Sequence, residues 1–262
     1  MKVQVLVSTM HQSNHDLLER MNIQTDAIVV NQCDNDTIET FLYNGNTIKW
    51  LSLNERGVGL SRNSALMRAD AEVVLFADDD VYYNDDYASL IIAAFNRSPN
   101  ADAIILNLRP PEGPRKLKPI TSVKRLNYFN GMRYGTVHLA AKLSSLRREN
   151  INFSLLFGGG AKYSAGEDTI FIMDCLKHRL KVYTCPDYIG GMIARASTWF
   201  QGYNDKYLFD KGAVYRAVSK MMARPLCLQL LIRHKEMWRS NDLSFFGAYK
   251  LMCGGIREMS SR

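Results

Sequence analysis

The sequence predicts an α/β protein with a mostly parallel central sheet flanked by helices and with a helical C-terminal extension. Two patterns predict this class. Through about the first 110 residues, apolar strand-like runs alternate with helical periodicities, as in a doubly wound sheet. About the last 50 residues show helical spacing alone. The chain has 262 residues, 47% of them hydrophobic, so it can bury a sizeable core and is neither disordered nor collagenous.

The first half alternates regularly between strands and helices. Strand-like apolar runs occur at 3–7, 27–30, 47–53, 72–76 and 101–108. Helical spacing occurs between them at 17–21, 57–69 and 85–95. The run at 72–76 is typical of a strand buried on both faces of a parallel sheet. Ligands are therefore expected at the carboxyl ends of these strands.

The second half begins with a loop. Residues 109–118 contain three prolines, one glycine and four basic residues, which predicts a loop. The six basic residues of the longer segment 109–125 fit either a solvated basic loop or a segment that closes over an acidic acceptor or the diphosphate. The elements expected after it are strands at 135–139 and 181–185, helices at 140–148 and 167–180, a glycine-rich connection at 153–164, and helices at 205–222, 225–238 and 242–258. We divide the chain into a main domain at 1–210, with halves 1–108 and 109–210, and an extension at 211–262.

The positive charge of the chain is concentrated in the extension. The net charge is +7, and residues 211–262 hold ten Lys or Arg against three Asp or Glu. Residues 1–210 are therefore neutral overall, and an anionic partner is expected at the C-terminal end. In the same region, the apolar run at 225–232 leads into Arg233, and Leu243, Phe246, Tyr249 and Ile256 repeat an apolar stripe. Such stripes fit a membrane surface, the main domain or a second copy of the chain, and we favour peripheral membrane contact.

Cysteine usage and the N-terminus bear on the compartment. The five cysteines form no CxxC pair and no zinc-finger spacing, so a reducing, cytoplasmic compartment is expected. The N-terminus carries no charged-then-apolar leader, and no run of about 18 apolar residues occurs. The sequence thus predicts neither secretion by that route nor a membrane span.

The strongest local signal is the aspartate triplet 78–80, directly after the predicted buried strand at 72–76. Three adjacent carboxylates repel one another, and a bound divalent cation offsets that cost. The alternative is an acidic turn that caps the next helix.

Two glycine-led segments carry further charged side chains. The first, at 57–63, opens a helix and includes Arg62, which suits a phosphate or is simply a surface arginine. The second runs from 158 to 166 and leads into Glu167 and Asp168. These carboxylates either cap the helix that follows or place a general base beside a flexible glycine wall.

In this order and spacing, the motifs resemble those of glycosyltransferase family 2, the inverting enzymes of the GT-A fold. The matching segments are Ser8, residues 32–34, residues 59–63, residues 77–80 and residues 166–168. The resemblance spans roughly residues 1–210. It implies a GT-A, Rossmann-like sheet and an enzyme that transfers a sugar, with inversion, from a nucleotide-diphosphate sugar, with a UDP-sugar favoured.

The resemblance also implies roles for particular residues. It assigns the base and ribose pocket to Ser8, Thr9, Gln32 and Asp34. It places Arg62 near the nucleotide. It assigns contact with the ribose and with a Mg²⁺ or Mn²⁺ ion to the aspartate triplet. Within the triplet, Asp78 and Asp79 are expected toward the nucleotide, and Asp80 and Asp78 toward the metal. Of the pair Glu167 and Asp168, Asp168 is the expected base.

One departure from the family concerns the metal. Many relatives place a histidine after the late strand as a further metal ligand, and none occurs at 190–199 here. Arg195 or Lys206 could supply part of the missing positive charge at the diphosphate.

By analogy with the family, the acceptor is a saccharide or lipid-linked saccharide of cell-surface polysaccharide biosynthesis, and the site of action is the cytoplasm or the inner face of the cell membrane. No nucleic-acid partner is expected, and a homo-oligomer is compatible with the tail. Two alternatives stay open at this point: a sugar-1-phosphate nucleotidylyltransferase, and a non-catalytic protein that binds anionic surfaces.

Overall fold

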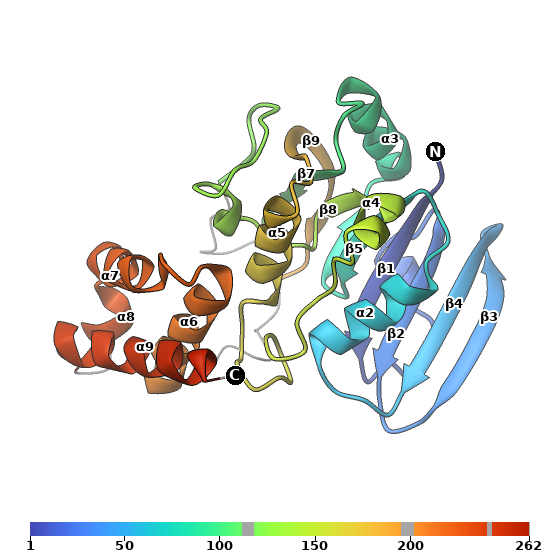
Figure 1. The fold of residues 1–262 in the computed structure, drawn as a ribbon. Coiled ribbons are helices and arrows are strands. Elements are labelled where there is room, and N and C mark those ends of the chain that lie inside the picture. The colour runs from blue at the N-terminus through green and yellow to red at the C-terminus, as the bar shows by residue number, and fades with distance from the viewer. Residues whose placement is uncertain (112–117, 195–201, 240–242, 262) are drawn as a thin grey trace.

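The computed structural model describes residues 1–111, 118–194, 202–239 and 243–261, and within them nine strands form one sheet with helices on both faces (Figure 1). The strands are β1 (Val3–Met10), β2 (Asp26–Gln32), β3 (Thr37–Tyr43), β4 (Asn46–Leu53), β5 (Val73–Asp78), β6 (Val81–Tyr83), β7 (Ala103–Arg109), β8 (Leu139–Lys142) and β9 (Val182–Met192). The helices are α1 (Leu17–Arg20), α2 (Val58–Arg68), α3 (Tyr87–Arg97), the 3₁₀ turn η1 (Gly131–Arg133), α4 (Leu143–Arg148), α5 (Glu167–Lys177), α6 (Asp205–Val218), α7 (Ala223–Arg233), α8 (Glu236–Arg239) and α9 (Phe245–Ser260).

The strand order in the sheet is β3-β4-β2-β1-β5-β8-β7-β9-β6. Strands β4, β2, β1 and β5 run parallel to one another, as do β7 and β9. Strands β3, β8 and β6 pair antiparallel. The predicted α/β class with a helical C-terminal region is confirmed, and the parallel pairing is concentrated in the nucleotide-binding half of the sheet expected at 1–108.

The two faces of the sheet bury separate cores. One core joins the sheet to α2, α4, α5 and part of α6. The other joins it to α1 and α3. Because the parallel strands β1, β2 and β5 end at the same edge, the residues that follow them lie close together.

The C-terminal helices form a third, smaller core around Leu208, Cys227 and Met252. Figure 1 shows α6–α9 gathered on one side of the molecule, opposite the β3–β4 edge. Helix α6 also contributes Val214 to the first core, so it joins the helical group to the sheet. The boundary we placed at residue 210 falls inside α6, and the domain division remains a prediction.

Three expected elements differ from the structure. The strand predicted at 135–139 lies at Leu139–Lys142, and the helix predicted from 140 begins at Leu143. Ala140 and Ala141 favour a helix intrinsically, but they pair with β5 on one side and β7 on the other, and burial in the middle of the sheet overrides that propensity. The single helix expected at 225–238 is divided into α7 and α8 at His234.

Strand β3 was not predicted. It pairs antiparallel with β4 through the turn at Asn44 and Gly45, whose φ angles are 50° and 78°. None of the β3 side chains is fully buried. The segment therefore carries no alternation of apolar and polar residues by which the sequence could have predicted the strand. The Asn-Gly pair is the hairpin signal that could have revealed it.

Candidate active site

The aspartate triplet lies at the carboxyl end of the buried strand β5. Asp78 is the last residue of β5, and Asp79 and Asp80 form the turn into β6. Residue 78 pairs with Ser8 of β1. The carboxylates are therefore positioned by the most buried part of the sheet, beside the end of the first strand.

Arg62 projects from α2 into the interior beside this strand end. The helix begins after Gly57, whose φ of 135° suits glycine. At Gly59 a Cβ atom would lie 2.7 Å from the carbonyl oxygen of Ser154, so α2 packs against the backbone of the segment between α4 and α5. Arg62 is on the buried face of α2 and only 3% exposed.

Glu167 and Asp168 occupy the first turn of α5. Gly166 precedes them with a φ of 111°, and a Cβ there would lie 2.3 Å from Val214 of α6. The glycine thus lets α6 pack directly on the start of α5. Two carboxylates at a helix N-terminus are favourable, which accounts for their presence but not for what they contact.

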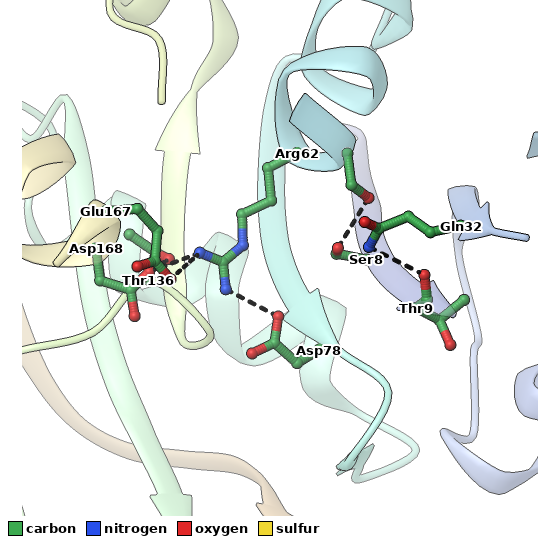
Figure 2. A network of polar contacts seen from close by, with 9 residues as sticks. Ser8, Thr9, Gln32, Arg62, Asp78, Thr136, Glu167 and Asp168 are labelled. Carbon is green, nitrogen blue, oxygen red and sulfur yellow. Dashed lines mark hydrogen bonds and ion pairs between the residues drawn. The ribbon is translucent and has the colours of Figure 1, made fainter. Parts of the chain in front are cut away.

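The guanidinium of Arg62 joins both acidic groups, as Figure 2 shows. Its Nη2 donates to Asp78 Oδ1 at 2.9 Å. Its Nη1 donates to Asp168 Oδ1 at 2.8 Å and to Glu167 Oε1 at 3.2 Å. The structure therefore brings Asp78 of the triplet and the Glu-Asp pair, distant in the chain, to one buried cation.

Asp168 is held by a second donor. The hydroxyl of Thr136 donates to the same Oδ1 that Arg62 contacts. The other oxygen, Oδ2, faces Gly135, where a Cβ atom would approach it to 3.2 Å. A glycine at 135 keeps this side of the carboxylate open to another group.

The cluster has more negative than positive charge, because three carboxylates share one guanidinium. Burial opposes the charge of Arg62, but Asp78, Asp168 and Glu167 raise the pKa of Arg62 above its ordinary value. Burial and the charge of Asp168 raise the pKa of Glu167 to about 7, against the opposing effect of Arg62. The cluster can therefore bind one proton near neutral pH.

The four residues expected to line the nucleotide pocket differ in their surroundings. Ser8 is buried and donates to the Ser61 hydroxyl at 2.8 Å. Gln32 is also buried and accepts from the Gly57 N–H at 2.7 Å, and its Nε2 donates to the Thr9 carbonyl oxygen at 3.3 Å (Figure 2). These two side chains connect β1 and β2 to α2.

Thr9 and Asp34 differ from each other in exposure, since Thr9 is only 3% exposed. The Thr9 hydroxyl donates to Asp79 Oδ2 at 2.6 Å, which ties the end of β1 to the triplet. The Asp34 side chain is 83% exposed and pairs with Arg56. A cavity of about 660 Å³ lies beside these strand ends, and its lining includes Gln12, Asn31 and Cys33.

Lys206 and Arg195 are the two side chains expected to supply positive charge at the diphosphate, and the structure describes only the first. Lys206, in the first turn of α6, donates to Asp210 Oδ2 at 2.7 Å and to the carbonyl oxygen of Lys162 at 3.0 Å. The structure thus ties it to the connection that leads into α5. Arg195 lies outside the described residues.

Comparison with known proteins identifies the family. A sequence model of the family described as "Glycosyl transferase family 2" matches residues 8–152, more than half of the chain. The chain belongs to glycosyltransferase family 2. The match includes the aspartate triplet and Arg62 but ends before Glu167, so the part taken by the Glu-Asp pair in this glycosyltransferase is argued from geometry.

Solved structures share the fold of this glycosyltransferase at low sequence identity. The crystal structure of residues 1–349 of S. aureus TarS, in complex with UDP-GlcNAc, has a TM-score of 0.65 and 18% identity over 92% of this chain and 74% of that one. The mannosyltransferase PcManGT from Pyrobaculum calidifontis, in complex with GDP-Man and Mn²⁺, has a TM-score of 0.52 and 13% identity over 99% of this chain and 75% of that one. No curated protein sequence matches significantly.

These findings confirm the resemblance to glycosyltransferase family 2, the GT-A type of fold and a glycosyltransferase activity. They decide against the nucleotidylyltransferase and the non-catalytic alternatives. In the part of the chain that the structure describes, no helix is long and apolar enough to cross a membrane.

Two residues of this glycosyltransferase that the sequence did not indicate lie in or beside the site. Thr136 contacts Asp168 from a connection without a recognisable motif. Lys211 of α6 lies near Glu167; burial lowers the pKa of this lysine while the Glu167 charge raises it. Both approach α5 from distant parts of the chain, so no local pattern could have revealed them.

The donor set of this glycosyltransferase suits a hard divalent cation. Carboxylate oxygens are the ligands that Mg²⁺ and Mn²⁺ prefer. Among the described residues, no group of three His, Cys, Asp or Glu side chains could hold a metal by itself. Mg²⁺ in nucleotide sites is commonly held by one or two carboxylates, with the remaining oxygens from phosphate and water. The carboxylates of the aspartate triplet are donors of this kind.

Proposed function

We propose that this enzyme transfers a sugar, with inversion, from a nucleoside-diphosphate sugar to a hydroxyl of a saccharide or lipid-linked saccharide. The observation that carries the proposal is the contact of one buried guanidinium with both Asp78 and Asp168. A donor diphosphate at the triplet and an acceptor hydroxyl at Asp168 would then lie within one site.

Asp168 is the general base of this proposal. Arg62 and Thr136 hold its Oδ1, which leaves Oδ2, beside Gly135, to accept the acceptor's hydroxyl proton. The acceptor oxygen then forms the new bond to the anomeric carbon from the face opposite the leaving group, while the bond from that carbon to the diphosphate oxygen breaks. The configuration at the carbon inverts, and no covalent enzyme intermediate is needed.

The triplet serves the departing diphosphate. Asp80 and Asp78 are the ligands proposed for Mg²⁺ or Mn²⁺, and Asp79, tied to Thr9, is proposed to face the ribose. A divalent cation supplies positive charge where the diphosphate gains negative charge. Lys206 and Arg195 are the proposed additional cations, and the PcManGT complex with GDP-Man and Mn²⁺ supports metal use.

Glu167 is proposed to maintain the charge balance around Asp168. Its raised pKa keeps a proton on it near pH 7, so a second negative charge beside Asp168 is partly avoided. Asp168 then remains the carboxylate that shares Arg62 with Asp78.

We favour a UDP-sugar donor. The TarS complexes with UDP-GlcNAc and UDP support this choice. The 660 Å³ cavity lined by Cys33 and Asn35, the chain neighbours of Asp34, is the proposed base and ribose site. Ser8 and Gln32 hold the strand ends beside it against the start of α2. We further propose that the acceptor belongs to cell-surface polysaccharide biosynthesis and that the enzyme acts at the inner face of the cell membrane.

A thermal-shift screen of the full chain with UDP, GDP and ADP, each with and without Mg²⁺ or Mn²⁺, tests the donor class. A ligand that binds only the folded protein raises its Tm. We expect UDP with a cation to raise the Tm most, and Asp80→Asn to lose the cation-dependent part of the shift. Asp86→Asn, an exposed aspartate outside the site, is the matched control and should behave as wild type. The absence of a shift with every nucleotide would refute the proposal.

A further inference from the structure

Helix α7 is amphipathic, and the described part of the chain leaves one of its faces exposed. Its inward face places Ala223, Cys227 and Leu231 in the third core, each at most 1% exposed. On the outward face, Leu228 and Ile232 are 36% and 60% exposed, and Met221 just before the helix is 89% exposed. The spacing 221, 225, 228 and 232 follows one side of a helix.

A second exposed apolar segment lies beside the start of this stripe. Tyr128 is 49% exposed and Phe129 is 97% exposed. A cavity of about 640 Å³ is lined by Tyr128 together with Lys220 and Met221. Tyr128 of the loop tip and Met221, just before α7, therefore lie on the same cavity, which joins the loop tip to the start of the stripe.

The cavity between them is basic. Lys177, Arg216 and Lys220 line it, and no carboxylate among the described residues does. Lys177 pairs with Asp174 at 2.8 Å and Arg216 donates to the Ser260 hydroxyl, whereas the structure records no ion pair for Lys220 among the residues it describes. The sequence contains no Asp or Glu from 113 to 148 or from 211 to 235, so both segments that form the surface lack acidic residues.

The other apolar stripe predicted in the tail does not share this surface. Ile256 of α9 is 8% exposed and belongs to the third core, and Leu243 and Tyr249 pack against that core. Only Phe246 of that stripe is strongly exposed, at 79%. The structure therefore assigns the free apolar face of the tail to α7.

The charge of the α7 surface decides which partner it fits. A second copy docked through this surface would bring together two sets of cations, including Lys220 and the exposed Arg224 of α7, with no Asp or Glu at 211–235 to pair with them. Like charges oppose such an interface. A nucleic acid would meet the cations but would not bury Phe129, Met221 and Ile232, because nucleic-acid interfaces are polar. An anionic bilayer meets both demands, since its headgroups attract the cations and its acyl boundary accepts the apolar side chains.

We infer that the outward face of α7 and the loop tip at 128–129 lie on an anionic bilayer surface, with the Lys177, Arg216 and Lys220 cavity receiving lipid phosphates. This inference rests on the membrane location proposed above and adds the surface that serves it. The sugar-transfer site is formed by other residues.

Vesicle flotation of the full chain tests the inference. Vesicles of phosphatidylcholine alone are compared with vesicles containing about 30% phosphatidylglycerol. We expect the wild type to bind the anionic vesicles at least tenfold more tightly, and both Met221→Ser/Leu228→Ser/Ile232→Ser and Lys220→Glu/Arg224→Glu to weaken that binding at least tenfold. Ile38→Ser/Leu42→Ser, on the opposite β3 edge and 65% and 74% exposed, is the matched apolar control and should bind as wild type.

Each contrary outcome overturns the inference. The inference is wrong if the wild type binds neither vesicle, or if the α7 variants bind as tightly as the wild type. It is also wrong if the wild type is a dimer that these variants convert to monomers. The UDP thermal shift is measured on the same preparations. A variant that loses vesicle binding but keeps that shift supports the surface, whereas vesicle binding by a protein without any nucleotide shift would count against the proposed reaction alone.

Discussion

Arg62 is the residue on which both halves of the candidate site depend. It is buried, and its three carboxylate partners come from β5 and α5. Its guanidinium also lies 5.2 Å from the ring of Phe153. A planar fork with several donors can serve three carboxylates at once, which a lysine ammonium cannot do in the same geometry.

Replacing Arg62 should cost far more stability than replacing a surface arginine. Arg62→Met leaves three partly buried carboxylates without their buried cation, so we expect a loss of about 3–5 kcal/mol in the free energy of unfolding at pH 8. Arg56→Met is the control, because Arg56 pairs with the exposed Asp34 and should cost less than about 1 kcal/mol. Urea unfolding measures both, and equal losses would contradict the role given to Arg62.

Glu167 gives the cluster a pH dependence. Its pKa is raised from 4.5 to about 7 in the folded protein, so the folded state holds a proton that the unfolded state releases between these values. This contribution to stability is fully present below about pH 4.5 and is lost as the pH rises through 7. Its size is about 3 kcal/mol at most.

Glu167→Gln should remove that dependence. We expect the wild type to lose about 2–3 kcal/mol more than the variant when urea unfolding is compared at pH 5 and pH 8. Glu149→Gln is a control on the protein surface at the end of α4. If the wild type and Glu167→Gln lose stability equally over this interval, the raised pKa is wrong.

The sequence indicated the acidic members of the site but not their contacts. Asp78, Glu167 and Asp168 stood out because they follow a buried strand or begin a helix after glycines. Arg62 was expected near the nucleotide, and its ion pairs depend on how α2 and α5 pack, which no local pattern encodes. Thr136 and Lys211 were missed for the same reason.

At the scale of elements, α6 and α9 pack with their backbones in contact. A Cβ at Gly255 would lie 1.9 Å from the carbonyl oxygen of Phe209, and one at Gly212 would lie 1.9 Å from that of Met252. Glycines at these two positions allow the close approach. Because α6 also packs on Gly166, this contact helps to support the start of α5.

Two adjacent glycines of α9 provide a test of that packing. Gly255→Ala should destabilise the protein by at least about 2 kcal/mol, since backbone has to move. Gly254→Ala meets only the edge of the Phe209 ring at 3.0 Å, and the helix gains about 1 kcal/mol from alanine, so it should lie within about 1 kcal/mol of wild type. Urea unfolding followed by far-UV circular dichroism separates the two, and similar values would contradict the close contact.

Most elements were predictable because their hydrophobic period is strong. The central strands and α2, α3 and α5 follow their apolar patterns. Strand β8 was predicted at the wrong position because Ala140 and Ala141 favour a helix by intrinsic propensity. Their pairing with the strands on both sides makes them part of the sheet instead. Strand β6, only three residues long, is formed by its pairing with β9 and leaves no periodic signal.

At the scale of the whole molecule, the site is assembled where three parts meet. The parallel strands supply Asp78, α2 supplies Arg62, and α5, supported by α6, supplies Asp168. The match to the family model, at residues 8–152, includes the first two parts. The third part, α5 with Asp168, follows that match in the chain. The central claim is that these parts form one catalytic centre with Asp168 as its base.

The most direct test of this claim is the rate at which Asp168→Asn releases nucleoside diphosphate, with water as acceptor, from the UDP-sugar that gives the largest thermal shift. We expect a fall of about 10²–10⁴-fold with the UDP shift unchanged. Asp174→Asn, in the same helix and paired with Lys177 on the surface, should keep the wild-type rate. A wild-type rate for Asp168→Asn would contradict the claim.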